Sequence, residues 1–141
     1  MSQGVTKSAL ESLAQAKFND ALLLFNSGRW ANAFYLAGYA VELGLKACIA
    51  KQILPEAIPD RRFINSVYTH EYMKLIGLAG LTADLRVRQD ADSVFAANWG
   101  IVGEWTPEAR YESTDKSTAH LLLSAISDAN HGVLPWIKTY W

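Results

Sequence analysis

Apolar residues recur every three or four positions along most of this chain, which is the spacing of one face of an α-helix. The first such run covers about residues 6–26, and Gly28 is a suitable terminator for it. The second run, about residues 30–54, is apolar on nearly every side and is followed by Pro55. A helix of that kind is surrounded by other helices, so we expect it at the centre of the fold.

Three more helical segments follow. They cover about residues 70–79, residues 82–98, and a last run that begins near residue 114. A kink or break is expected near Gly132, because Pro135 has no backbone N–H to donate. No segment alternates as a half-buried strand does. The pattern predicts a single all-α domain over residues 1–141, an up-down antiparallel bundle of about five helices.

Composition narrows the function classes. Of the 141 residues half are hydrophobic, and the net charge of −1 provides no overall attraction to nucleic acid. Cys48 is the only cysteine and no two histidines are four apart, so we expect no disulfide, no metal and no cofactor. Uncharged apolar stretches fall short of the roughly 20 residues of a bilayer span, and no signal peptide is recognisable. We therefore expect a cytoplasmic protein with no membrane contact.

Three motifs in a fixed order resemble those of a known family. The second predicted helix contains Tyr-Leu-Ala-Gly-Tyr-Ala-Val-Glu-Leu-Gly-Leu-Lys at residues 35–46. Thr-His-Glu-Tyr follows at residues 69–72, and Trp105 with Arg110-Tyr111 precedes the long last helix. Together these motifs resemble the HEPN family of helical-bundle proteins, over roughly residues 8–138.

The resemblance carries expectations about partners and activity. It implies an up-down bundle that forms a homodimer and occurs in toxin–antitoxin pairs and phage-defence systems. A nucleotidyltransferase encoded nearby, or another defence-system protein, is the partner that the resemblance suggests. Many members are metal-independent ribonucleases, so RNA is a further possible partner, although the net charge of this chain does not favour it.

The family's ribonucleases carry an arginine, four to six further residues, and then a histidine. Such a pair suits RNA cleavage, because histidine can take the proton of a 2′-hydroxyl while arginine stabilises the phosphorane. Seven residues separate Arg62 from His70 here, and nine separate Arg110 from His120, so the motif is missing. The sequence favours a non-catalytic or catalytically degenerate module. The alternative is a ribonuclease with a rearranged site built from His70, Arg110 and His120.

Two charges stand on the most apolar helix. Glu42 and Lys46 are four residues apart, in the favourable acid-then-base order. Buried charges need partners, and Arg110 and His70 are candidate partners for Glu42. A structural ion pair is the favoured interpretation. The alternative is a site for a nucleotide or another small ligand, formed by Glu42, Lys46, Arg110 and Tyr111.

Overall fold

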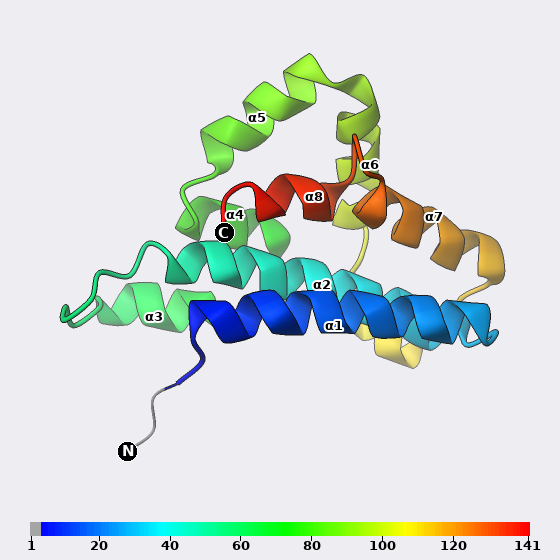
Figure 1. The fold of residues 1–141 in the computed structure, drawn as a ribbon, viewed down its shortest axis with the longest axis horizontal. Helices are drawn as coiled ribbons and strands as arrows, with labels where there is room; N and C mark the ends of the chain where they lie inside the picture. The colour runs from blue at the N-terminus through cyan, green and yellow to red at the C-terminus, as the bar shows by residue number, and fades with distance from the viewer. Residues whose placement is uncertain (1–3) are drawn as a thin grey trace.

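The computed structural model describes residues 4–141, and every regular element in that range is helical (Figure 1). The elements follow in this order: α1 Lys7–Asn26, α2 Trp30–Ala50, α3 Arg61–Val67, α4 Tyr72–Leu78, α5 Thr82–Ala91, α6 Ser93–Gly103, the 3-10 helix η1 Pro107–Tyr111, α7 Lys116–Ser127 and α8 Val133–Lys138. The all-α prediction is confirmed. The expected number of about five helices is too low, since the described part of the chain forms eight α-helices.

Two of the additional helices arise because predicted helices are interrupted at aspartates. Asp92 has an extended backbone (φ −143°, ψ 98°) and its carboxylate accepts the N–H groups of Val94 and Phe95. A side chain that satisfies these free N–H groups favours a new helix start, so residues 82–98 do not form one rod. After α7 the Asp128 carboxylate accepts the N–H groups of Asn130 and His131 in the connecting turn, and α8 begins after Gly132, where a kink or break is predicted.

The third additional helix is α3, which the apolar pattern did not reveal. It begins after Pro59 with Asp60 as its N-cap, whose carboxylate accepts the N–H of Phe63 at 3.1 Å. Its seven residues include no buried side chain. Local capping rather than burial of an apolar face therefore defines where this short helix starts.

The second predicted helix does lie at the centre of the fold. α2 forms an antiparallel pair with α1 along the length of the molecule (Figure 1), and it also contacts α4, η1, α7 and α8. It ends at Ala50, short of the expected residue 54. Among residues 4–141, α2 is the one helix with the length and apolar composition of a membrane span, and 67% of that stretch is buried inside the fold, as in a core helix.

Two glycines of α2 allow other segments to reach its backbone. A Cβ atom on Gly38 would lie 2.2 Å from the indole Nε1 of Trp105, just before η1. A Cβ atom on Gly44 would lie 3.2 Å from Ile137 of α8. The thiol of Cys48, one turn further on, is buried and donates to the Ile137 carbonyl at 3.7 Å. Small residues on the central helix thus fix where η1 and α8 pack.

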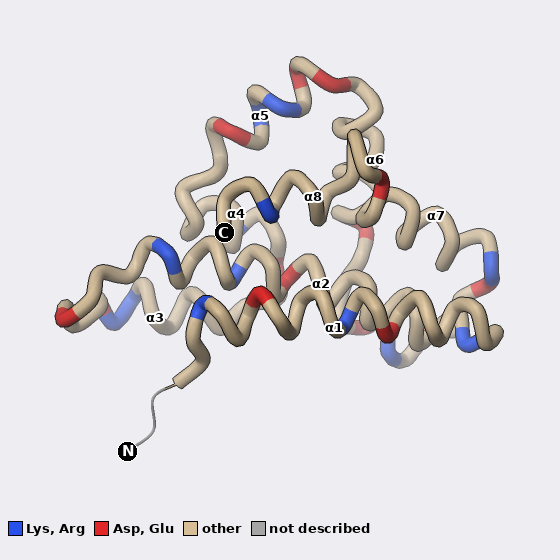
Figure 2. Tube along the Cα trace, in the orientation of Figure 1, with Lys and Arg blue, Asp and Glu red and all other residues tan. Residues whose placement is uncertain are grey.

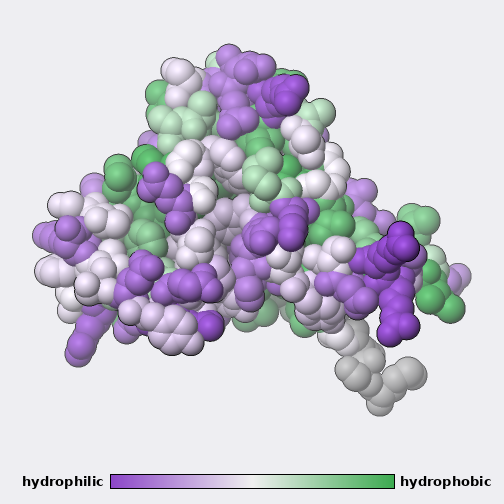
Figure 3. Space-filling model, turned by 180° about the vertical axis from the view of Figure 1, so that it is seen from behind, coloured by the Kyte–Doolittle hydropathy of each residue, from purple (hydrophilic) through white to green (hydrophobic). Residues whose placement is uncertain are grey.

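Charge and hydropathy are distributed unevenly over the surface. Lys, Arg, Asp and Glu are scattered along the helices with both signs mixed, and α5 carries both signs (Figure 2). Seen from behind, the surface over α5 is strongly hydrophilic, whereas hydrophobic side chains stand at the end formed by the α2–α3 connection (Figure 3). Leu54 and Ile58 of that connection are 71% and 97% exposed.

Candidate functional site

A buried carboxylate on α2 is the centre of the first polar cluster. Of the residues that the structure describes, Glu42 is the only polar or charged one that is buried, at 1% exposure. Its Oε2 lies 3.0 Å from Nζ of Lys46, and its Oε1 lies 2.7 Å from Nδ1 of His70. The predicted ion pair is present, and of the two candidate partners His70 takes the second oxygen. Both carboxylate oxygens are thereby satisfied, as burial requires.

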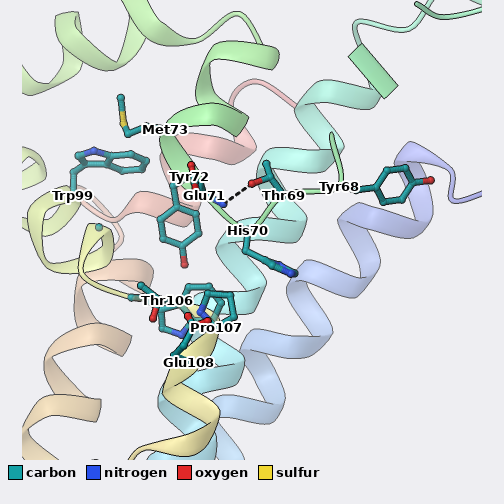
Figure 4. Close-up of a pocket in the computed structure, with 12 residues that line it drawn as sticks. Tyr68, Thr69, His70, Glu71, Tyr72, Met73, Trp99, Thr106, Pro107 and Glu108 are labelled. Atoms are coloured by element: carbon teal, nitrogen blue, oxygen red, sulfur yellow. Dashed lines mark hydrogen bonds between the residues drawn. The ribbon is translucent and has the colours of Figure 1, made fainter. Parts of the chain in front are cut away.

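His70 connects this cluster to the surface. It lies between α3 and α4, is 57% exposed, and its ring points toward α2 and away from Trp99 (Figure 4). With Nδ1 on the carboxylate, Nε2 is the second ring nitrogen that can take part in a hydrogen bond. Just before α4, the hydroxyl of Thr69 accepts the N–H of Glu71, and the helix begins at Tyr72 and not at His70.

Aromatic rings adjoin the Glu42 cluster. The hydroxyl of Tyr72 donates to the Gly38 carbonyl at 2.7 Å, and its ring stacks on Trp105 with 5.6 Å between centroids. Tyr35 of α2 also stacks on Trp105, with 6.0 Å between the ring centroids. Burial and the nearby Glu42 charge raise the pKa of the Tyr72 phenol well above its usual value, so Tyr72 acts as a neutral donor.

Arg110 and Tyr111 lie elsewhere, at the end of η1. The guanidinium of Arg110 stands 4.9 Å from the centre of the Tyr111 ring, and both residues are exposed. The phenol oxygens of Tyr111 and then Tyr35 raise the pKa of Arg110 further. Arg110 makes no ion pair with Glu42 within residues 4–141. The four residues of the predicted ligand site therefore form two separate pairs, Glu42 with Lys46 and Arg110 with Tyr111.

The residues of the predicted rearranged ribonuclease site are also engaged separately. His70 contacts Glu42, whereas the exposed His120 on α7 packs its ring 5.8 Å from the ring of Phe25 on α1. Across the described chain, no hydrogen bond or ion pair joins Arg110 to either histidine. His131, which an unbroken last helix would place on one face with His120, lies instead in the connection between α7 and α8.

A second polar cluster escaped the sequence analysis. Oδ2 of Asp92 lies 2.7 Å from Nδ1 of His131 and 3.3 Å from Nη2 of Arg88. Arg88 also donates to the Asn130 carbonyl at 2.8 Å. The hydrogen bond from His131, together with the capped N–H of Phe95, lowers the pKa of Asp92 to about 2. Residues 39 apart meet here, and neither this contact nor the capping role of Asp92 was predicted from the sequence.

A pocket opens beside the aromatic rings. It has a volume of about 560 Å³ and lies between the start of α4, the α6 helix and the segment entering η1 (Figure 4). Pockets of this size accept small molecules. A smaller pocket of about 320 Å³ lies between α1, α2 and α3. The described residues contain no group of three or more histidine, cysteine or acidic side chains that could hold a metal ion.

Comparisons of the chain with protein-family models, with curated proteins and with solved structures find no match. The HEPN resemblance therefore depends on the motifs at residues 35–46, 69–72 and 105–111. In the structure these three motifs are neighbours. His70 contacts Glu42, and Tyr72 and Tyr35 both stack on Trp105. Their proximity accounts for the motifs as one packing unit around the middle of α2.

Proposed function

We propose that this protein is a non-catalytic HEPN-like interaction module that acts as a cytoplasmic homodimer, within a toxin–antitoxin or phage-defence system. One observation carries the non-catalytic part. The two histidines that a rearranged ribonuclease would use, His70 and His120, contact a buried carboxylate and a phenylalanine ring, and neither contacts Arg110. A proton acceptor and a phosphate-stabilising cation must converge on one reacting group.

The homodimer part is supported by leucines on neighbouring helices. Leu23 of α1 is 67% exposed, Leu22 is 41% exposed, and Leu121 of α7 is 53% exposed. The contact between Phe25 and His120 shows that these parts of α1 and α7 adjoin. Covering large apolar side chains with a second copy removes them from water, which is the main driving force of association.

Light scattering over a range of protein concentrations tests the homodimer. We expect the wild-type protein to have the mass of a dimer and the Leu23→Glu, Leu121→Glu double variant to be monomeric. Ile58→Glu is the matched control, because Ile58 is equally apolar and 97% exposed but lies on the α2–α3 connection. A wild-type protein that stays monomeric at every concentration contradicts the homodimer.

Incubation with total RNA tests the non-catalytic part. We expect no cleavage that depends on His70, Arg110 or His131. The last is included because His131 and Arg88 share the Asp92 carboxylate, the one place in the described chain where a histidine and an arginine meet. Cleavage by the wild type that disappears in His70→Ala, Arg110→Ala or His131→Ala would establish a ribonuclease instead. A nucleotidyltransferase partner is tested separately, by co-purification with any such protein encoded next to this one.

A further inference from the structure

The pocket of about 560 Å³ has a wall that is rich in aromatic side chains. Tyr72, Trp99 and Trp105 line its inner part and are at most 8% exposed. Tyr68 and Met73 line its outer part and are 82% and 58% exposed. In Figure 4, Tyr72 and Trp99 lie on one side, with Thr106, Pro107 and Glu108 opposite. Because Trp105 stacks with both Tyr72 and Tyr35, this wall offers a ligand mainly apolar contact.

The charges of this pocket have one sign. Glu71 and Glu108 line it, and no lysine or arginine does. Lys74 stands 3.0 Å from Glu71, but both side chains of that pair are 66% exposed, so water screens the attraction. Glu108 makes no ion pair within residues 4–141. The one histidine of the lining, His70, already has its Nδ1 on Glu42.

From the aromatic wall and the acidic rim together we infer that this pocket binds a small organic cation, a protonated or quaternary ammonium group attached to an apolar body. The carboxylates at the rim attract the cation, and the aromatic wall takes up the apolar body that carries it. The site is distinct from the ligand site expected around Arg110 and Tyr111, neither of which lines it. It is also independent of the proposed homodimer, since α1 and α7 contribute nothing to the lining.

The same features disfavour a nucleotide here. Phosphate groups are held in proteins by arginine, lysine or the N-terminal N–H groups of helices. The pocket has no lysine or arginine, and α4, which begins at the pocket, is only seven residues long and has the Glu71 carboxylate at its start. The two carboxylates of the lining would repel a phosphate. The aromatic wall alone would accept a nucleobase, so charge is the property that separates the two ligand classes.

Two probes that differ mainly in charge test this preference for a cation. Choline and 3,3-dimethylbutan-1-ol have nearly the same shape, and only choline is positively charged. We expect choline to bind, benzyltrimethylammonium to bind more tightly because it adds an apolar ring, and the neutral alcohol and adenosine monophosphate not to bind. The readout is the NMR signal of each indole N–H. Trp99 and Trp105 should shift, whereas Trp30, Trp136 and Trp141, which do not line the pocket, should not.

Variants at the exposed rim leave the aromatic wall intact. Glu108→Gln should weaken benzyltrimethylammonium binding about two- to five-fold, as expected for a partly screened charge pair. Glu104→Gln is the matched control, because Glu104 is exposed and close in sequence but does not line the pocket. Equal binding of the charged and neutral probes, tighter binding of adenosine monophosphate, or no indole shift with any probe would each overturn the inference. An equal effect of the two glutamate variants would place the site elsewhere.

Discussion

The two carboxylate clusters of this protein have the same chemical parts in different surroundings. Glu42 binds Nδ1 of His70 at 2.7 Å and Lys46 at 3.0 Å, and Asp92 binds Nδ1 of His131 at 2.7 Å and Arg88 at 3.3 Å. Glu42 is 1% exposed on the central helix, whereas the Asp92 side chain is 15% exposed at a helix break.

That difference in burial decides what each cluster does. The partners of Glu42 replace the hydration that its charge loses on burial, so α2 can pack in the core only when these contacts are made. The Asp92 carboxylate remains partly hydrated, and its Oδ1 accepts hydrogen bonds from the N–H groups that start α6. A carboxylate, a histidine and a cationic side chain thus balance the charge on a core helix in one place. In the other place the same groups lie where one helix ends and the next begins.

The largest expected effect is the loss of a partner from the buried cluster. Lys46→Met leaves the Glu42 carboxylate with His70 alone, and we expect a loss of about 2–3 kcal/mol in the free energy of unfolding. Urea denaturation measures it. Lys74→Met is the matched control, because Lys74 pairs with Glu71 at the same 3.0 Å but at 66% exposure, and such exposed pairs contribute about 0.2–1 kcal/mol.

A double variant tests whether the effect of Lys46→Met comes from the buried charge that it leaves behind. Replacing Glu42 and Lys46 together by methionine removes the buried charge as well as its partner, so most of the lost stability should return. Equal losses for Lys46→Met and Lys74→Met would show that the two surroundings do not differ as described.

An intermediate effect is expected from the backbone of the second region. A Cβ atom at Gly132 would lie 2.4 Å from the Asp128 carbonyl oxygen and 2.7 Å from its amide nitrogen. Backbone atoms cannot move aside as a side chain can, so Gly132→Ala should destabilise the protein by about 1–3 kcal/mol. Thermal unfolding measures it. Gly100→Ala is the control, since nothing lies within 4 Å of a Cβ atom there, and it should be neutral or slightly stabilising.

The smallest expected effect is the response of Asp92 to acid. Its pKa in the folded state is about 2, below the ordinary 3.8. The ionised carboxylate therefore stabilises the fold at pH values above 3.8. That contribution disappears as the pH falls from about 4 to about 2. Asp92→Asn keeps an oxygen to cap α6 but cannot titrate. The wild type should lose stability relative to this variant across that pH range, and a constant difference would contradict the assignment.

The sequence predicted most of the α-helices because their burial pattern is local. The stripe of α1 and the all-round apolar surface of α2 follow from residue spacing alone. The interruption near Gly132 was expected from Pro135. The helix break at Asp92 was missed, because the apolar spacing continues through it while a capping side chain redirects the backbone. Capping competes with helix continuation through a few hydrogen bonds, which periodicity does not register.

The polar sites were predictable only where both partners share a helix. Glu42 and Lys46 are one turn apart, so their pairing could be inferred from spacing. The contact between His70 and Glu42 spans 28 residues, and that between His131 and Asp92 spans 39. Arg110 was assigned to the wrong cluster because its place depends on how η1 packs against α2, a tertiary property. Trp99 and Trp105 stand near one another in the sequence, but the pocket that they line depends on the same packing.

The seating of α8 against Gly44 and Cys48 has a consequence for biosynthesis. Ile137, which covers this part of α2, follows Cys48 by 89 residues. A ribosome therefore completes the most apolar helix of the protein long before it makes the segment that shields it. Until translation reaches α8, nascent α2 presents uncovered glycine and thiol surface to chaperones. A premature stop before Val133 would make that exposure permanent.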